Sequence, residues 1–362
     1  MHMSDMTSRQ RLFASLHGER PDRVPVSPFG LGHLDPDGPA AAELIARTDP
    51  FLTIGLGGNV FAGTAVEVVS RQEGAEIITR IQTPAGQLVQ RDRRTEITSS
   101  TVEFPCKNAD DVEAYLSIPF VPAVPRVDGF LKRRGELGEE ALLLAGIGDA
   151  ICFPATILSP EDMCLLWMDA PDLLRACVAA AHSRLMEYVD AACRGGVDAF
   201  RIVGGEYATE QLGPDGFDAL VKPWDTELVT LMHRHKALAY YHNHGYVETY
   251  LETFADLGID FLDPLEVAPY GNVDLGDAHR RIGDRVCIVG GLDDMEVLET
   301  RDRATVLRMG RAHLEMVGHV GGFCLGGTAS GTYTERAARN FIALAQESER
   351  FCRRDVRRGQ RG

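Results

Sequence analysis

The stretch Ala237-Leu238-Ala239-Tyr240-Tyr241-His242-Asn243-His244-Gly245 begins as a short apolar and aromatic run and ends in two histidines before a glycine. Such a run is typical of a buried β-strand. Alternate residues of a strand point to the same face, so we expect His242 and His244 to face the same side where the strand ends. Neutral imidazole is the commonest protein ligand for metal ions, and the pair therefore predicts a metal site.

Similar apolar runs alternate with helical patterns beyond residue 140. Strands that alternate with helices of this length indicate parallel βαβ units. With a strand at 24–29 and another within 51–120, the count reaches about eight, which predicts a single (β/α)8 TIM barrel. A doubly wound sheet is the alternative, and it is disfavoured because no strand is followed by a GxGxxG turn. The other expected strands are 141–147, 199–203, 261–262, 285–289 and 322–325, and the expected helices are 171–194, 216–235, 247–257, 273–282 and 303–317.

The N-terminal third has a different pattern. Helical patterns at 8–17 and 37–47 predict an N-terminal helical extension of the barrel. Runs rich in β-forming residues surround the turn signal Thr83-Pro84-Ala85-Gly86 and predict an antiparallel β-hairpin insertion at about residues 60–105. The chain has no internal repeat, low-complexity segment or linker, so we expect one domain over 1–362.

Composition limits the classes of partner. The chain has 37 basic and 53 acidic residues and a net charge of -16, which disfavours nucleic acid as a partner. No apolar run approaches the roughly 20 residues of a membrane-spanning helix, and the N-terminus lacks a signal core. We therefore expect a soluble, cytoplasmic enzyme for a small molecule, with no membrane partner. The eight cysteines form no CxxC pair and are expected to be free thiols.

Polar residues follow several of the predicted strands. In a TIM barrel the active site lies at the C-terminal ends of the strands, so these residues should meet at one rim. Two histidines and several carboxylates are the composition of a His/carboxylate metal site. The residues in these positions are His33, Asp35, Asp149, Glu206, His242, His244, Asp263, Glu266 and Asp293.

Each of these residues also has a simpler interpretation. The histidine pair can bind substrate or pack instead of binding metal, although two polar side chains on one face are hard to place in a core. Glu206 follows a Gly-Gly pair and is either a ligand or a loop carboxylate. Asp263 precedes Pro264, which also opens an ordinary turn. We predict His33, Glu206 and Asp263 as catalytic residues.

The order of several motifs resembles the uroporphyrinogen decarboxylase superfamily along nearly the whole chain. The resemblance implies a TIM barrel that is often a homodimer. The motifs that carry it are the opening Arg11-Leu12-Phe13…Gly18…Pro21-Asp22-Arg23-Val24-Pro25-Val26, the turn Thr83-Pro84-Ala85-Gly86, Gly213-Pro214…Phe217…Pro223, Gly291-Leu292-Asp293 and Thr334…Asn340.

The match is nearest the corrinoid-linked zinc methyltransferases of that superfamily, with one departure. Those enzymes carry His-x-Cys-Gly at the strand end and a second Cys after the last strand. This chain reads His242-Asn243-His244-Gly245, and 326–331 contains no thiol unless Cys324 takes its place. Imidazole in place of thiolate moves the expected site towards the 2-His-1-carboxylate set of non-haem Fe(II) oxygenases. The decarboxylase itself needs no metal, and its Arg-rich N-terminal loop is missing after Pro28.

The first hypothesis is therefore an oxygenase that acts on a small polar organic substrate. His242, His244 and Glu206 would bind one divalent metal, Fe(II) rather than Zn(II), with O2 as co-substrate, and Glu266 is the second choice for the third ligand. The alternatives are a zinc methyltransferase that works with a corrinoid protein, a metal-independent decarboxylase or lyase, and a binding barrel without catalysis.

Overall fold

Eight parallel strands form one sheet in the computed structural model, which describes residues 6–95, 99–327 and 332–359. The sheet closes into a barrel because Phe29, just after β1, pairs in parallel with Phe51 at the start of β2. The predicted TIM barrel is confirmed. In spatial order the strands are β1 (Val26–Ser27), β12 (Phe323–Gly327), β11 (Cys287–Leu292), β10 (Phe261–Leu265), β9 (Leu238–His242), β8 (Ala199–Val203), β7 (Leu142–Gly148) and β2 (Phe51–Gly55).

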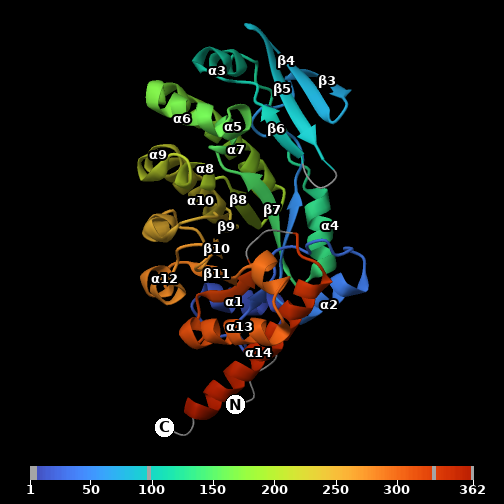
Figure 1. Cartoon of the computed structure of the whole chain (residues 1–362), viewed down its shortest axis with the longest axis vertical. Helices are drawn as coiled ribbons and strands as arrows, with labels where there is room; N and C mark the ends of the chain where they lie inside the picture. The colour runs from blue at the N-terminus through green and yellow to red at the C-terminus, as the bar shows by residue number, and fades with distance from the viewer. Residues whose placement is uncertain (1–5, 96–98, 328–331, 360–362) are drawn as a thin grey trace.

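Helices connect the strands and cover the outside of the barrel (Figure 1). Helix α7 (Pro171–Arg194) has ten buried residues along its inner face. The others are α1 (Ser8–Leu16), α2 (Pro39–Arg47), α3 (Ala109–Leu116), α4 (Asp128–Leu137), α5 (Cys152–Ile157), α6 (Pro160–Asp169), α8 (Glu206–Thr209), α9 (Gly213–Leu220), α10 (Lys222–Arg234), η1 (Glu248–Tyr250), α11 (Leu251–Asp256), α12 (Leu275–Ile282), η2 (Asp294–Leu298), α13 (Arg303–Val317) and α14 (Glu335–Gly359).

The interior of the barrel is apolar over most of its height. Phe51, Tyr240 and Phe261 pack together there, with ring centroids 4.7–5.8 Å apart. Helix α1 closes the N-terminal end, because its Leu12 is fully buried in this cluster. The hydroxyl of Ser15 in α1 donates to the carbonyl of Phe323. Of the two helices predicted for the N-terminal extension, α1 therefore forms the floor of the barrel, whereas α2 connects β1 to β2 and packs against α14 in the wall.

The insertion is a four-stranded antiparallel sheet at one end of the elongated molecule (Figure 1). Strands β4 (Glu76–Thr83) and β5 (Gly86–Arg94) are the predicted hairpin, and Thr83 pairs with Gly86 at its turn. The sheet has more strands than the predicted hairpin. Strands β3 (Glu67–Glu73) and β6 (Ser99–Glu103) extend it on either side.

One predicted helix is two. The helical pattern at 216–235 is divided into α9 and α10 at Val221, whose φ of -120° and ψ of -60° break the helical geometry. Pro223 follows within the first turn of α10, where its missing N–H costs nothing. Among the described residues, no helix is long and apolar enough to cross a membrane.

Candidate active site

His242 is the last residue of β9 and lies beside Asp263 of β10 in the sheet register. The Nδ1 atom of His242 is 2.8 Å from Oδ2 of Asp263. Both side chains are buried, with 5% and 0% of their surfaces exposed. A buried carboxylate therefore fixes the orientation of a buried imidazole at the C-terminal end of the barrel.

His244 follows β9 and has a carboxylate partner of its own. Its Nδ1 atom is 3.3 Å from Oε1 of Glu266, and Oε2 of the same carboxylate accepts the N–H of Gly245 at 2.9 Å. Gly245 has a φ of +99°, and a Cβ there would collide with the side chain of Glu210. Glycine is therefore required for the turn that presents His244 beside the strand.

The two imidazoles lie close together, and each is oriented by a carboxylate in the same way. Their ring centroids are 4.6 Å apart and their planes are nearly perpendicular. Each Nδ1 atom contacts a carboxylate, and neither Nε2 atom has a hydrogen bond within the described part of the chain. A carboxylate on one ring nitrogen sets the tautomer and leaves the other nitrogen free, as in carboxylate–histidine–metal arrangements.

The two histidines differ in electrostatics. Burial has the largest influence on His242 and lowers its pKa, although Asp263 acts in the opposite direction. Burial also opposes charge on His244, but the hydrogen bond and charge of Glu266, with the charges of Asp263 and Glu206, outweigh it and raise the pKa of His244. The inner imidazole is therefore the better neutral ligand.

We expected Asp263 to be a catalytic group and Glu266 to be a metal ligand. In the structure, Asp263 contacts the imidazole of His242 and Glu266 contacts that of His244. Glu206 is at the first position of α8, and its Oε2 accepts the N–H of Gly204 at 3.2 Å. In the described residues, no group of three or more His, Cys, Asp or Glu side chains is arranged to hold a metal ion. The chemistry of the pair suits a divalent metal, because the two imidazole Nε2 atoms are the donors that would hold it. The fragment 328–331, near the position of the family's second thiolate, lies outside the described residues.

His33 is not connected to the pair by any described contact. It is exposed in the turn after β1, and its backbone N–H donates to the carbonyl of Tyr333. Its predicted catalytic role receives no support from this placement.

Arg201 of β8 is a site residue that the sequence analysis did not identify. Its guanidinium lies 4.4 Å from the centroid of the Phe29 ring, and that ring is stacked with His242 at 6.1 Å. Burial lowers the pKa of Arg201, while the charges of Asp263, Tyr240 and Glu206 act in the opposite direction. The signal in the sequence was one charged residue inside the apolar run Ala199–Val203.

A second group of acids lies on the outer side of the same strands. Tyr241, the neighbour of His242, donates its hydroxyl to Oδ2 of Asp225 in α10 at 2.7 Å. Burial raises the pKa of Asp225 to about 7, and burial with the charges of Asp225 and Glu206 raises the pKa of Asp149 well above its ordinary value. Both acids are buried, and burial disfavours their charged forms.

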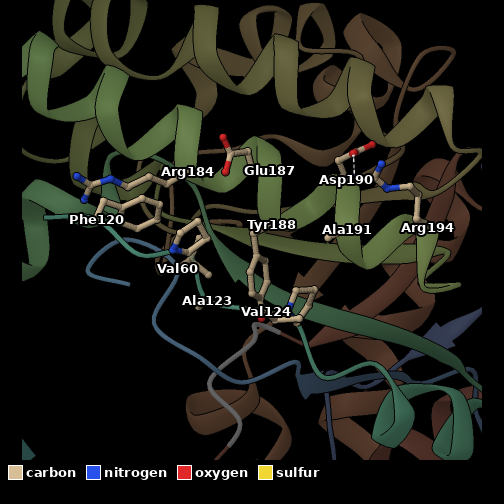
Figure 2. A pocket seen from close by; sticks show the side chains of 12 residues that line it. Val60, Phe120, Ala123, Val124, Arg184, Glu187, Tyr188, Asp190, Ala191 and Arg194 are labelled. Atoms are coloured by element: carbon tan, nitrogen blue, oxygen red, sulfur yellow. Dashed lines mark ion pairs between the residues drawn. The ribbon is translucent and has the colours of Figure 1, made fainter. Parts of the chain in front are cut away.

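A surface pocket lies elsewhere in the molecule. Figure 2 shows it beside α7, where Arg184 lies next to Phe120, Tyr188 points towards Val124, and Arg194 pairs with Asp190. None of the predicted site residues lines it. It is therefore separate from the histidine pair.

Comparisons with known proteins agree with the fold. The family model described as uroporphyrinogen decarboxylase (URO-D) matches residues 86–342. A methyltransferase from Methanosarcina mazei has a similar structure, with a TM-score of 0.63 and 16% identity over 94% of this chain and 99% of that one. A putative vitamin-B12 independent methionine synthase from Listeria monocytogenes has a TM-score of 0.40 and 17% identity, and covers 62% of this chain and 68% of its own. No curated protein sequence matches this chain.

Proposed function

The chain belongs to the uroporphyrinogen decarboxylase family, and from that premise we propose that it is a metal-dependent enzyme that transfers a methyl group. In this proposal His242 and His244 are ligands of one zinc ion at the C-terminal end of the barrel, which we call the barrel mouth. The observation that carries it is the pair of imidazoles whose Nδ1 atoms contact Asp263 and Glu266 and whose Nε2 atoms remain available.

Methyl transfer is favoured over the other activities of the family for two reasons. The similar Methanosarcina structure is a methyltransferase, and its whole length aligns with this chain. The histidine pair also occupies the strand end at which the resemblance places the metal ligands of the methyltransferases. A metal-independent decarboxylase would leave two carboxylate-oriented imidazoles without a role.

In the proposed site, the metal and the two carboxylates have different roles. Zinc bound there supplies Lewis acidity that lowers the pKa of a thiol or water. Asp263 accepts the Nδ1 proton of His242 and keeps its Nε2 atom free, and Glu266 does the same for His244. The methyl group would come from or go to a corrinoid carried by a partner protein, as the resemblance implies.

The iron oxygenase that the donor types predicted has less support. A 2-His-1-carboxylate site needs a carboxylate on the metal. Asp263 and Glu266 already contact imidazole nitrogens, so Glu206 is the remaining candidate for that ligand. The comparisons provide no support for oxygen chemistry in this chain.

Metal content tests the site. Protein purified without oxygen and dialysed against zinc should hold about one zinc per chain, and His242→Ala and His244→Ala should each lose most of it. His233→Ala is the matched control, because His233 also contacts a carboxylate, Asp260, at 3.0 Å but lies on α10. Stoichiometric iron in place of zinc would support the oxygenase, and no retained metal would support the decarboxylase.

Methyl transfer is tested by following the absorbance of free cob(I)alamin with a panel of small methylated donors. The zinc-loaded enzyme should methylate the cobalamin with at least one donor, and His242→Ala should lower that rate at least a hundredfold. A rate that does not change in His242→Ala would contradict the proposal.

A further inference from the structure

We propose that Arg201 binds a carboxylate group of the substrate at the barrel mouth. The inference deepens the proposed function and rests on it for the identity of the ligand as substrate. It names the substrate class as a small monocarboxylic acid, whose carboxylate lies at Arg201 while its reacting group lies near the histidine pair.

The position of Arg201 in the sheet places it in the mouth. It pairs with Tyr240 of β9 and with Gly146 of β7. Tyr240 belongs to the cluster inside the barrel, and Phe29, which packs on that cluster, lies under the guanidinium. Arg201 is therefore level with Tyr240, one residue pair below His242 in the register, and the ring of Phe29 contacts both side chains.

Arg201 has no ion pair or hydrogen bond among the described residues, although it is half-buried. Its Nε atom is buried without a partner. Its described contact is with the face of the Phe29 ring. Arg184 also lies over an aromatic ring, but it donates to the carbonyl of Phe61. A buried guanidinium Nε–H without an acceptor costs free energy unless a ligand supplies one.

The chemistry of a guanidinium selects a planar oxyanion. Its N–H groups form a rigid fork that matches the two oxygens of a carboxylate or two oxygens of a phosphate. The ring of Phe29 covers a face of the guanidinium and leaves its edge for such a ligand.

Charge in the mouth favours the carboxylate over the phosphate. The carboxylates Asp263 and Glu206 act on Arg201 electrostatically, although neither is within ion-pair distance. A dianionic phosphate would meet more repulsion from them than a monoanion does. We therefore expect the natural ligand to carry a single carboxylate at this point.

The test uses 4-fluorobenzoate and its neutral amide, 4-fluorobenzamide, in fluorine NMR titrations of the full chain. Metal-free wild-type protein should bind the benzoate at least tenfold more tightly than the amide, and inorganic phosphate should compete weakly. Arg201→Gln should lower the affinity for benzoate at least tenfold, and Arg201→Lys should lower it by a smaller factor because it keeps the charge without the fork.

Arg9→Gln is the matched control. Arg9 also lies over an aromatic ring, Phe13 at 5.1 Å, but it pairs with Asp198 at the opposite end of the barrel. Its substitution should leave benzoate binding unchanged. Should Arg201→Gln fail to fold, Arg201→Lys and the preference of the wild type for benzoate over amide decide the question.

Three results would overturn the inference: no benzoate binding to folded wild-type protein, equal binding of the amide, or full benzoate affinity in Arg201→Gln. Benzoate binding that requires zinc would also overturn it, since the carboxylate would then bind the metal. Binding by metal-free protein that depends on Arg201 would stand even if the zinc assay failed, so the two proposals fail separately.

Discussion

The arginine side chains at the two ends of the barrel differ in their partners. At the N-terminal end, Arg11 contacts Asp22 and Asp49 at 2.6 Å each, and Arg23 contacts Asp49 at 2.5 Å. At the C-terminal end, Arg201 lies on an aromatic ring with no ion pair among the described residues. At the N-terminal end, aspartates of the protein itself neutralise the arginine charges, and these ion pairs stabilise the fold. At the end that carries the site, charge is left for a ligand.

The largest effect is expected at the N-terminal end. Asp49→Ala would leave two buried arginines without their shared carboxylate, and the N–H of Val26 would lose its acceptor. We expect the free energy of unfolding to fall by about 3–5 kcal/mol in urea titrations. The exposed pair Asp256–Arg285 is the control, and Asp256→Asn should change it by less than about 0.5 kcal/mol. A loss below about 1 kcal/mol in Asp49→Ala would show that the pairing is not what stabilises this end.

The next effect is expected at the mouth and should appear in metal binding, with little change in folding. Asp263→Asn removes the charge that holds the Nδ1 proton of His242, and the zinc affinity should fall roughly 10–100-fold in competition with a chelating dye. Asp260→Asn, at the carboxylate partner of His233, should leave zinc affinity unchanged. Equal losses in the two variants would mean that Asp263 does not act through the imidazole.

The smallest expected effect is on the pH dependence of stability, and it comes from the buried carboxyl group of Asp225. The pKa of Asp225 is about 7 in the folded protein against an ordinary value of 3.8, so the folded state keeps a proton that the unfolded state releases. The stability that this proton gives is complete below about pH 4 and is lost as the pH rises through about 7. Between about pH 5.5 and 7, the wild type should lose about 1–2 kcal/mol more than Asp225→Asn does.

Urea titrations at the two pH values measure this difference, with Asp218→Asn on the exposed side of α9 as the control. The control should follow the wild type. An Asp225→Asn variant with the same pH dependence as the wild type would show that Asp225 is ionised in the folded protein.

Much of the fold could be predicted because its strands and helices have strong patterns. Strand β8, predicted at 199–203, and helices α7 and α13, predicted at 171–194 and 303–317, have the bounds that the sequence indicated. The break between α9 and α10 was missed because the apolar spacing continues across Val221. Of the outer strands of the insertion, β6 was missed. The run at 66–69 is rich in β-forming residues and overlaps β3, but it was not joined to the hairpin, because β3 is exposed along its whole length and so shows no alternation of buried and exposed residues.

The site could be predicted in part. The spacing of His242 and His244 placed both at one strand end, as the structure does. The partner of each imidazole could not be read from the sequence, because it depends on the register between β9 and β10 and on the turn at Gly245. The same holds for Arg201, whose lack of a partner is a property of the surrounding strands.

The central claim is that imidazole, without thiolate, holds the metal at the mouth. Zinc K-edge X-ray absorption of the zinc-loaded protein tests it most directly. We predict a shell of nitrogen and oxygen at about 2.0–2.1 Å, with imidazole scattering that weakens in both His242→Ala and His244→Ala. A sulfur shell at about 2.3 Å, or imidazole scattering that both substitutions leave unchanged, would contradict the claim.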